Sequence, residues 1–288
     1  MQISIVVNPV SGTNSARKRA KRVVKAIEEH FCIKALYTEY AGHGIELTQQ
    51  LIAKGTDVLI AVGGDGTVNE ISSALTGSRT ALFIVPTGSG NGLARDLGMY
   101  GLSIKQIIER IEQNNIHLID SGMADKKAFF CTCGTGFDAY IGHLFAQTKV
   151  RGFLTYIKLS LHAFKNYTPL TYQLKTDQGE YTRQAFVINI ANNKQFGNNA
   201  YIAPLANMQD GLFTVTIIKP FKWYNVPYMA YSLFFKRMHK NKFVETFDCG
   251  DCKLTIPENG YLHVDGEPIT TQSNPVLIQI KPASIHVL

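Results

Sequence analysis

The stretch Val58-Leu-Ile-Ala-Val-Gly-Gly-Asp-Gly-Thr-Val-Asn-Glu70 decides the fold of the first half of the chain. It opens with continuously apolar residues, which predict a fully buried strand over Val58–Val62. Glycines follow at once, and apolar residues at helical spacing then predict a helix over Val68–Leu75. A buried strand that runs into a helix through a Gly-rich turn is typical of a parallel sheet with helices on both faces.

The same unit of strand, loop and helix recurs on both sides of this stretch. The predicted strands are Ile3–Asn8, Ile33–Thr38, Ala81–Val85 and Ile116–Asp120, and the predicted helices are Ala16–His30, Ile45–Lys54 and Ile104–Gln113. This alternation predicts a Rossmann-like α/β domain over residues 1–122. In such a sheet, ligands bind at the carboxyl ends of the strands, where the loops collect.

From about Lys127 onward, strand-like runs dominate the pattern. The predicted strands are Phe129–Cys133, Thr171–Thr176, Ala185–Asn192, Leu212–Lys219, Val244–Phe247, Lys253–Ile256, Tyr261–Val264, Val276–Ile280 and Ser284–Val287. Two aromatic-rich segments with helical patterns, Ala139–Tyr167 and Trp223–Lys242, interrupt them. We therefore expect an antiparallel β-sandwich or β-barrel over residues 123–288, with a return of the C-terminal strand to the first domain as the alternative.

The bulk composition excludes several classes of protein. With 288 residues, 45% of them apolar and 18% charged, the chain suits two globular domains and is neither disordered nor fibrous. It has no secretory leader and no run of about 18 apolar residues, so we expect a cytoplasmic protein. The five cysteines form no disulfide framework, and Cys249-Gly-Asp-Cys252 with Cys131-Thr-Cys133 is a poor match to zinc-ligand spacing.

Three loops with glycines follow the first, third and fourth predicted strands, and each leads into a helix. They are Asn8-Pro-Val-Ser-Gly12, Gly63-Gly-Asp-Gly-Thr67 and Pro86-Thr-Gly-Ser-Gly-Asn91. Glycine lets a backbone approach an anion closely, and a helix N-terminus presents unpaired N–H groups. Together the loops predict a cradle for a polyphosphate. The Walker motif and the V-A-I-K and D-F-G motifs are absent, which excludes P-loop NTPases and protein kinases.

An acidic residue, Asp65, lies among the glycines of the second loop. A carboxylate there would repel a phosphate directly, so we expect it to hold Mg²⁺ or its waters, or to accept a proton. Another Gly-rich stretch, Gly134-Thr-Gly-Phe-Asp-Ala139, has the spacing of a dinucleotide fingerprint. It lacks the acid that such a site needs about 20 residues later, because no Asp or Glu occurs between Asp138 and Asp177. We therefore expect no NAD binding at that stretch.

The three loops, in this order, resemble the diacylglycerol kinase catalytic-domain family, which includes diacylglycerol kinases, sphingosine kinases and bacterial lipid kinases. Val264-Asp-Gly-Glu-Pro268 and Asp210-Gly211 also resemble family motifs, so the resemblance covers essentially the whole chain. It implies an α/β domain like that of NAD kinases and phosphofructokinases, followed by a β-sandwich domain. It also implies ATP-dependent, Mg²⁺-dependent phosphorylation of a lipid hydroxyl group.

The resemblance implies roles for individual residues. Glu267 and Asp65 match the catalytic residues, with Glu267 as general base and Asp65 as organiser of Mg²⁺ and the γ-phosphate, although the reverse assignment stays open. Asp210, with the backbone oxygens of Asn207 and Leu212, matches a structural Mg²⁺ site. The residues expected to line the ATP site are Asn8, Pro9, Val10, Ser11, Gly12, Thr38, Gly63, Gly64, Asp65, Gly66, Thr67, Val68, Asn69 and Ser89.

The lipid substrate stays open because one motif departs from the family pattern. Where the family usually has Gly-Thr-x-Asn-Asp, this chain has Gly88-Ser-Gly-Asn-Gly92, so Ser89 keeps the hydroxyl but Gly92 replaces the acid. This form is closer to that of sphingosine kinases. We therefore expect a diacylglycerol-like alcohol, with a sphingoid base as the alternative. An NAD kinase and a non-catalytic nucleotide- or lipid-binding regulator are the remaining alternatives.

The basic residues concentrate in the second half of the chain. The net charge of +7 divides into +1 for residues 1–122 and +6 for the rest. The excess accompanies aromatic residues in segments 151–165 and 228–242, a pattern that suits an anionic membrane surface. The basic run Arg17–Lys25 is predicted to be a solvated helix face over the buried residues Ala20, Val23, Val24 and Ile27, with contact of its N-terminal arginines with phosphates as the alternative. We expect peripheral membrane association and no nucleic-acid partner; a homodimer is one assembly that the sequence allows.

Overall fold

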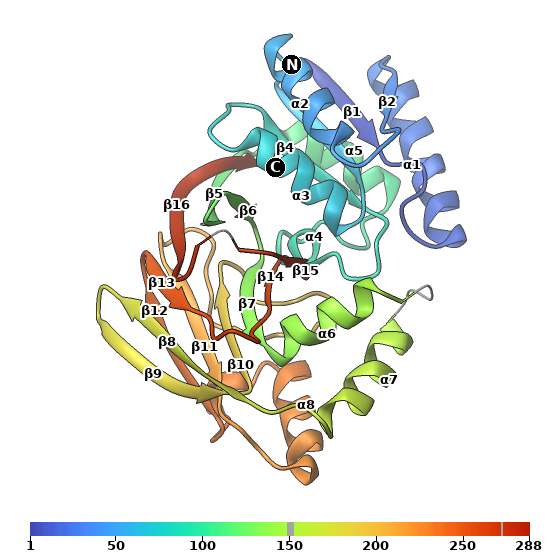
Figure 1. Cartoon of the computed structure of the whole chain (residues 1–288). Coiled ribbons are helices and arrows are strands. Elements are labelled where there is room, and N and C mark those ends of the chain that lie inside the picture. The colour runs from blue at the N-terminus through green and yellow to red at the C-terminus, as the bar shows by residue number, and fades with distance from the viewer. Residues whose placement is uncertain (149–152, 272) are drawn as a thin grey trace. The chain divides into compact units, whose positions relative to one another are not determined.

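The computed structural model describes residues 1–148, 153–271 and 273–288 and divides the chain into two units (Figure 1). Unit 1 comprises Met1–Asp120 and Ala283–Leu288, and unit 2 comprises Ser121–Pro282. The chain passes between the units in strand β5 (His117–Ala124) and again in strand β16 (Val276–Val287). Arg151, the first residue of one basic aromatic segment, lies outside the described residues.

Unit 1 is built on a parallel sheet with the strand order β2–β1–β3–β4 and the end of β16 beside β4. Every residue of β3 and β4 is buried, as expected for strands covered on both faces. This confirms the predicted α/β architecture. The strands are β1 (Ile3–Val7), β2 (Ala35–Tyr37), β3 (Val58–Gly63) and β4 (Ala81–Pro86), and the helices are α1 (Asn14–Phe31), α2 (His43–Ala53), α3 (Asp65–Leu75), α4 (Gly92–Asp96) and α5 (Ile104–Gln113).

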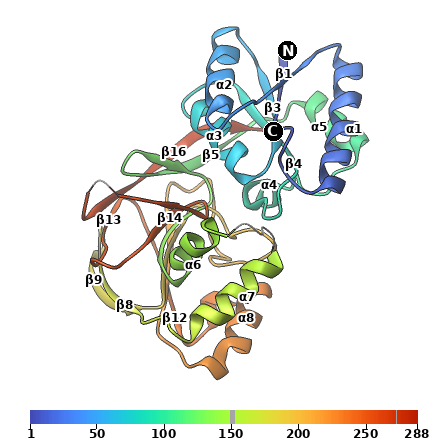
Figure 2. The same ribbon diagram turned by 45° about the vertical axis from the view of Figure 1, so that its right-hand side comes forward.

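The helices of unit 1 form a layer on each face of the sheet, with α2 and α3 on one side and α1 and α5 on the other (Figure 2). Local capping explains where two of them begin. The Thr13 side chain accepts a hydrogen bond from the N–H of Ala16 at the start of α1, and Ser103 and Gln106 form a capping box at the start of α5. The buried residues of α1 are Ala20, Val23, Val24 and Ile27, which confirms its predicted apolar stripe.

Unit 2 is an antiparallel β-sandwich. Its first sheet has the order β12–β11–β10–β7–β14–β15, and its second has the start of β16 followed by β13, β8 and β9. Apolar side chains from both sheets form one core, which includes Phe129, Tyr172 and Phe213. The strands are β6 (Lys127–Phe129), β7 (Thr132–Gly136), β8 (Leu170–Thr176), β9 (Gly179–Ala185), β10 (Val187–Ala191), β11 (Phe213–Ile218), β12 (Val244–Cys249), β13 (Cys252–Thr255), β14 (Leu262–Val264) and β15 (Glu267–Ile269).

The helices of unit 2 pack on the outer face of the six-stranded sheet. They are α6 (Phe137–Ala146), α7 (Phe153–Phe164) and α8 (Val226–Phe234), with short 3₁₀ turns η1 (Trp223–Asn225) and η2 (Met238–Lys240) around α8. A second apolar cluster joins this face to the helices through Val187, Ile218 and Met238. Within the part of the chain that the structure describes, no helix is long and apolar enough to cross a membrane.

Four predicted strands differ from the observed ones. The predicted strand Phe129–Cys133 is divided between β6 and β7, and Ala185–Asn192 spans the end of β9 and all of β10. The predicted pair Val276–Ile280 and Ser284–Val287 is one continuous strand, β16. It continues through Ala283, whose N–H donates to the Asp120 carboxylate (2.7 Å). Each difference lies where a contact distant in sequence overrides the local pattern.

Candidate active site

The first candidate loop follows β1 and is held by polar side chains of the neighbouring loops. Asn8 Nδ2 donates to Thr67 Oγ1 (2.8 Å), which ties the first loop to helix α3. The Ser11 and Thr87 hydroxyls are hydrogen-bonded (2.9 Å), which ties it to the loop after β4. Gly12 adopts a φ of +81°, and a Cβ there would collide with the Thr87 carbonyl group. The loop therefore takes one defined course against its neighbours.

The second candidate loop is the turn from β3 into α3. Gly63 ends the strand, Gly64 is the N-cap, and Asp65 is the first residue of the helix. A glycine N-cap has no side chain that could satisfy the first N–H groups of the helix, so these groups are available to an anion. Thr67 is buried, whereas Asp65, Gly66 and Asn69 are partly exposed. This helix start can receive a phosphate group.

The third candidate loop, between β4 and α4, is bound to Asp65. The Asp65 carboxylate accepts the backbone N–H groups of Asn91 (3.0 Å) and Gly92 (3.1 Å). Arg95 Nε donates to the Gly90 carbonyl oxygen (2.9 Å), and its guanidinium lies over the Tyr100 ring at 3.6 Å. Arg95 thus fixes the third loop through the Gly90 carbonyl group. An ionised carboxylate has about four acceptor positions, so Asp65 retains capacity for a cation or its waters.

These loops meet at one edge of the sheet of unit 1, because they follow adjacent parallel strands. The buried Thr38 lies at the same edge, since it follows β2 and its N–H donates to the Val7 carbonyl oxygen (2.9 Å). Unit 1 therefore brings together the sequence-predicted residues Asn8–Gly12, Thr38, Gly63–Asn69 and Ser89. Pro9, Val10 and Ser89 are exposed, and Val68 is buried, so Val68 belongs to the helix packing.

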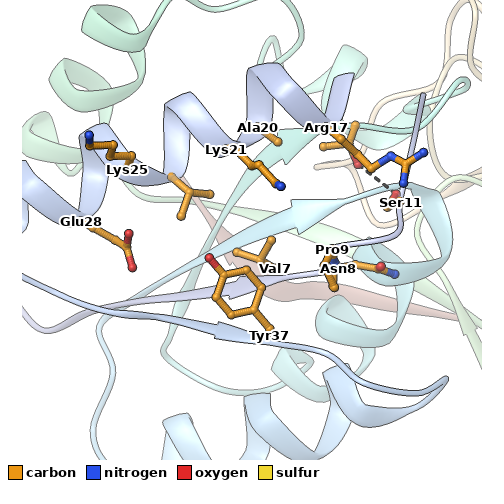
Figure 3. A pocket seen from close by; sticks show the side chains of 12 residues that line it. Val7, Asn8, Pro9, Ser11, Arg17, Ala20, Lys21, Lys25, Glu28 and Tyr37 are labelled. Atoms are coloured by element: carbon orange, nitrogen blue, oxygen red, sulfur yellow. Dashed lines mark hydrogen bonds between the residues drawn. The ribbon is translucent and has the colours of Figure 1, made fainter. Parts of the chain in front are cut away.

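A cavity of about 300 Å³ opens between the first loop and α1 (Figure 3). Its polar lining includes Arg17, Lys21 and Lys25 from α1 and Tyr37 from β2. Figure 3 shows the Arg17 and Lys21 side chains extending from α1 at the cavity that Val7, Asn8 and Ser11 also line. Arg17 Nε is buried without a hydrogen-bond partner among the described residues. Lys21 and Lys25 are exposed, as the sequence pattern predicts for this helix face. The fold shows in addition that this face borders the first loop.

The candidate base, Glu267, belongs to the hairpin between β14 and β15 in unit 2. Asp265 and Gly266 form the turn with φ values of +49° and +81°, the pattern of a two-residue type I′ hairpin. The Asp265 carboxylate accepts three backbone N–H groups, those of Phe130, Cys131 and Thr132, at 2.8–3.0 Å. Asp265 therefore anchors the turn.

Glu267 itself is the first residue of β15 and is exposed. Among the residues that the structure describes, its carboxylate has no hydrogen-bond partner. A carboxylate that is held on a fixed backbone but not engaged by the protein can accept a proton from a bound hydroxyl group. Unit 2 thus presents Glu267 in a form suited to a general base.

The predicted Mg²⁺ loop also lies in unit 2, ahead of β11. Asn207 and Asp210 are exposed, and Asp210 Oδ1 accepts the N–H of Leu212 (3.0 Å). Within residues 1–148, 153–271 and 273–288, no three His, Cys, Asp or Glu side chains gather at one point. One carboxylate with backbone carbonyls and waters is nevertheless an oxygen donor set of the kind that Mg²⁺ accepts.

The paired cysteines near the end of β12 belong to the apolar core. Cys249 and Cys252 are free and buried, and neither is exposed enough to meet a solvent ion. A hydrogen bond with Cys249, together with burial, raises the pKa of Cys252 well above its usual value. Both thiols therefore act as small apolar side chains.

Comparison with known proteins agrees with this organisation. Residues 2–124 match the diacylglycerol kinase catalytic domain, and residues 131–288 match the YegS C-terminal NAD kinase β-sandwich-like domain. A protein of Shewanella frigidimarina named "Probable lipid kinase YegS-like" is 24% identical, over 99% of this chain and 92% of its own length. A diacylglycerol kinase of Mycobacterium tuberculosis is 25% identical, over 75% and 72%. The crystal structure of a diacylglycerol kinase from Bacillus anthracis has the same fold, with a TM-score of 0.73 at 18% identity and coverage of 99% and 96%.

Proposed function

The chain belongs to the diacylglycerol kinase catalytic-domain family and is a lipid kinase; we propose that it transfers the γ-phosphate of ATP to the hydroxyl group of diacylglycerol or a related lipid alcohol. One observation carries the nucleotide assignment. Three strand-to-helix loops of unit 1 are hydrogen-bonded to one another at a single edge of the sheet, and a carboxylate lies among them. This arrangement combines backbone N–H groups for phosphate with an acid for a cation.

The residues of unit 1 fit ATP with Mg²⁺. The open N-terminus of α3 would bind phosphate oxygens, and Arg17 would neutralise phosphate charge from the cavity beside the first loop. Asp65 would hold the metal or its waters with the acceptor positions that the third loop leaves unused. Mg²⁺ in kinases commonly relies on one or two carboxylates plus the phosphates and offsets charge during phosphoryl transfer.

The remaining chemical task is removal of a proton from the attacking hydroxyl group. We assign it to Glu267, whose exposed carboxylate has no partner among the described residues and lies on an anchored hairpin. Asp210, with the Asn207 and Leu212 backbone, would hold a second, structural Mg²⁺ in unit 2. A sphingoid base is the second candidate substrate, because Gly92 starts α4 at the position where most of the family has an acid.

An assay with γ-labelled ATP tests this proposal directly. The protein should phosphorylate diacylglycerol in mixed micelles with Mg²⁺, and the panel should also contain a monoacylglycerol, sphingosine and NAD. Label in diacylglycerol supports the proposal, and label in sphingosine alone would move the substrate to sphingoid bases. Transfer to NAD but to no lipid would identify an NAD kinase, and ATP binding without any transfer would identify a regulator.

We further propose that the protein works in the cytoplasm and meets its lipid at an anionic membrane surface through α8 and its flanking turns. Over residues 219–243 the chain has six Lys or Arg residues and no Asp or Glu. Trp223 and Phe235 are 74% and 65% exposed, and Tyr224 and Phe234 are also exposed. Met229 and Leu233 pack inward on the second apolar cluster. The four exposed aromatic side chains therefore form an apolar surface outside this core. Lys219 is paired with Glu245 (3.9 Å), and the other five cations lie in a segment without acidic residues. Exposed aromatics among such cations suit anionic headgroups.

Vesicle flotation should detect this surface without any need for kinase activity. The protein should float with phosphatidylcholine vesicles that contain 30% phosphatidylglycerol and not with phosphatidylcholine alone. Each basic residue near a membrane contributes about 1 kcal/mol, so Lys236→Gln with Arg237→Gln should weaken partitioning about thirty-fold. The matched pair Lys18→Gln with Arg22→Gln, on the exposed face of α1, should leave it unchanged. Equal losses for both pairs would show that net charge, and not this surface, drives binding.

A further inference from the structure

A row of polar residues crosses the outer face of the six-stranded sheet of unit 2. Gly134 on β7 is paired with Asn189 on β10 and with His263 on β14, so all three lie side by side. Their neighbours along the strands, such as Cys133 and Val264, point to the opposite face and belong to the apolar core. Asn189 is fully buried and His263 is 3% exposed. Buried polar groups cost free energy unless they are paired, so this row needs an explanation.

The first turn of α6 supplies a partner for the histidine. Asp138 Oδ2 lies 3.0 Å from His263 Nε2, and the Asp138 side chain is 12% exposed. The contact passes directly over Gly134. A Cβ on Gly134 would lie 2.7 Å from His263 Nε2 and 3.0 Å from Asp138 Oδ2, closer than side chains tolerate. Gly134, the first glycine of the stretch with the spacing of a dinucleotide fingerprint, thus leaves room for the contact between Asp138 and His263.

The other ring nitrogen of His263 binds the hairpin that carries Glu267. The Gly266 N–H donates to His263 Nδ1 (3.3 Å). An ionised carboxylate only accepts hydrogen bonds and a backbone N–H only donates them. The ring therefore carries its proton on Nε2 and presents a lone pair on Nδ1 to Gly266. Asp138 selects the one neutral tautomer that can hold the Gly266 N–H.

We propose that Asp138 and His263 are positioning residues that fix the Asp265–Gly266 peptide of the hairpin turn and so aim the Glu267 carboxylate at the substrate hydroxyl. Asp265 fixes the other side of the same turn through the N–H groups of Phe130, Cys131 and Thr132. With both contacts in place, both residues of the turn before Glu267 are fixed, Asp265 through its side chain and Gly266 through its N–H group. This inference rests on the proposed role of Glu267 as general base. Positioning of this kind matters because small misplacements of a reacting group cost rate steeply.

Two substitutions of His263 separate positioning from simple packing. An Asn side chain places its oxygen near the position of Nδ1, so His263→Asn keeps an acceptor for the Gly266 N–H. A Gln side chain reaches the position of Nε2 and Asp138 but offers nothing at Nδ1. Both variants lose ring packing, and both are expected to lower the melting temperature. Only His263→Gln is expected to release the Gly266 amide.

The first measurement is hydrogen exchange of the Gly266 amide by NMR, with ATP and lipid absent. Exchange should be at least tenfold faster in His263→Gln than in the wild type and near wild type in His263→Asn. Long-range ¹H–¹⁵N spectra should show the Nε2–H tautomer in the wild type. A protonated ring, the other tautomer, or equal exchange in both variants would overturn the inference. This readout does not depend on kinase activity, so it stands even if the proposed function fails.

The second measurement is steady-state kinetics with the lipid that the wild type phosphorylates. We expect His263→Gln to lower kcat about a hundred-fold with KM for ATP unchanged, and His263→Asn to retain kcat within about fivefold. Phe196→Leu is the control, because the Phe196 and His263 rings pack in a T-shaped arrangement, with centroids 6.3 Å apart, and form no hydrogen bond. Equal kcat for the Gln and Asn variants would assign the pair a purely structural role. A rise in KM for lipid with kcat unchanged would show that the pair binds substrate instead.

Discussion

Replacement of Glu267 by Gln is expected to lower kcat by about a hundred- to ten-thousand-fold, the range typical for loss of a general base. The substitution keeps the shape and length of the side chain but removes its ability to accept a proton. Because the carboxylate is exposed and has no partner among the described residues, its removal should leave the melting temperature unchanged. KM for ATP should also stay near the wild-type value, since Glu267 lies in unit 2 and the loops assigned to ATP lie in unit 1.

Glu258 offers a matched control for this substitution. It is an exposed glutamate of unit 2, nine positions before Glu267, and it belongs to neither assigned site. Glu258→Gln should therefore leave kcat and the melting temperature unchanged. A near-normal kcat in Glu267→Gln would assign proton removal to another group, and Asp65 would be the first to test. A large fall in melting temperature would show that Glu267 contributes to the fold.

Asp65→Asn is expected to lower kcat about a hundred- to a thousand-fold, as for loss of one preorganised electrostatic contact. It should also raise KM for ATP. The wild-type carboxylate accepts the N–H groups of Asn91 and Gly92 at once. In the variant, one of the two side-chain oxygens becomes an NH₂ group, which faces an N–H donor and leaves it unpaired. The third loop should therefore loosen, and unfolding free energy should fall by about 1–3 kcal/mol.

A substitution of Glu70 serves as a control that separates the loss of stability in Asp65→Asn from its loss of catalytic activity. It lies on the same helix, α3, and its carboxylate also accepts two backbone N–H groups, those of Gly42 (2.8 Å) and Gly44 (3.2 Å). Glu70→Gln should therefore cost similar stability in urea unfolding while kcat stays within about threefold of the wild type. If the two variants lost stability and kcat in equal measure, the role of Asp65 would be to stabilise the third loop and not to organise Mg²⁺.

Hydrophobic patterning was sufficient to predict the architecture of both halves of the chain. The apolar runs of β3 and β4 are fully buried, and the stripe on α1 is buried as its spacing indicates. The predicted strand boundaries were wrong where a residue distant in sequence binds the backbone. The Asp265 carboxylate takes the N–H groups at positions 130–132, which ends one strand and starts another. No window of local sequence around residue 130 contains that information.

The candidate site was predictable at the level of loops but not of contacts. Glycines next to helix starts predicted the three loops that meet at one edge of the sheet, whereas the hydrogen bond between Asp65 and Asn91 spans 26 residues and has no local pattern. Contact of Arg17 with phosphate was only an alternative, because helical spacing cannot show which flank of α1 borders the first loop. His263 carried no signal at all, since a single histidine in a strand reads as an ordinary core residue. Its function depends on three strands and a helix meeting at Gly134.

The path of β16 has a consequence for how the protein is made. Residues 283–288 complete the sheet of unit 1, where the Leu288 N–H donates to the Leu82 carbonyl oxygen and Arg110 donates to the Leu288 carbonyl oxygen. These residues are synthesised only after all of unit 2. The first half of the chain therefore leaves the ribosome with an unpaired edge beside β4, and it stays incomplete until translation of the whole second half has finished. Maturation of the first unit is in this way tied to successful synthesis of the second.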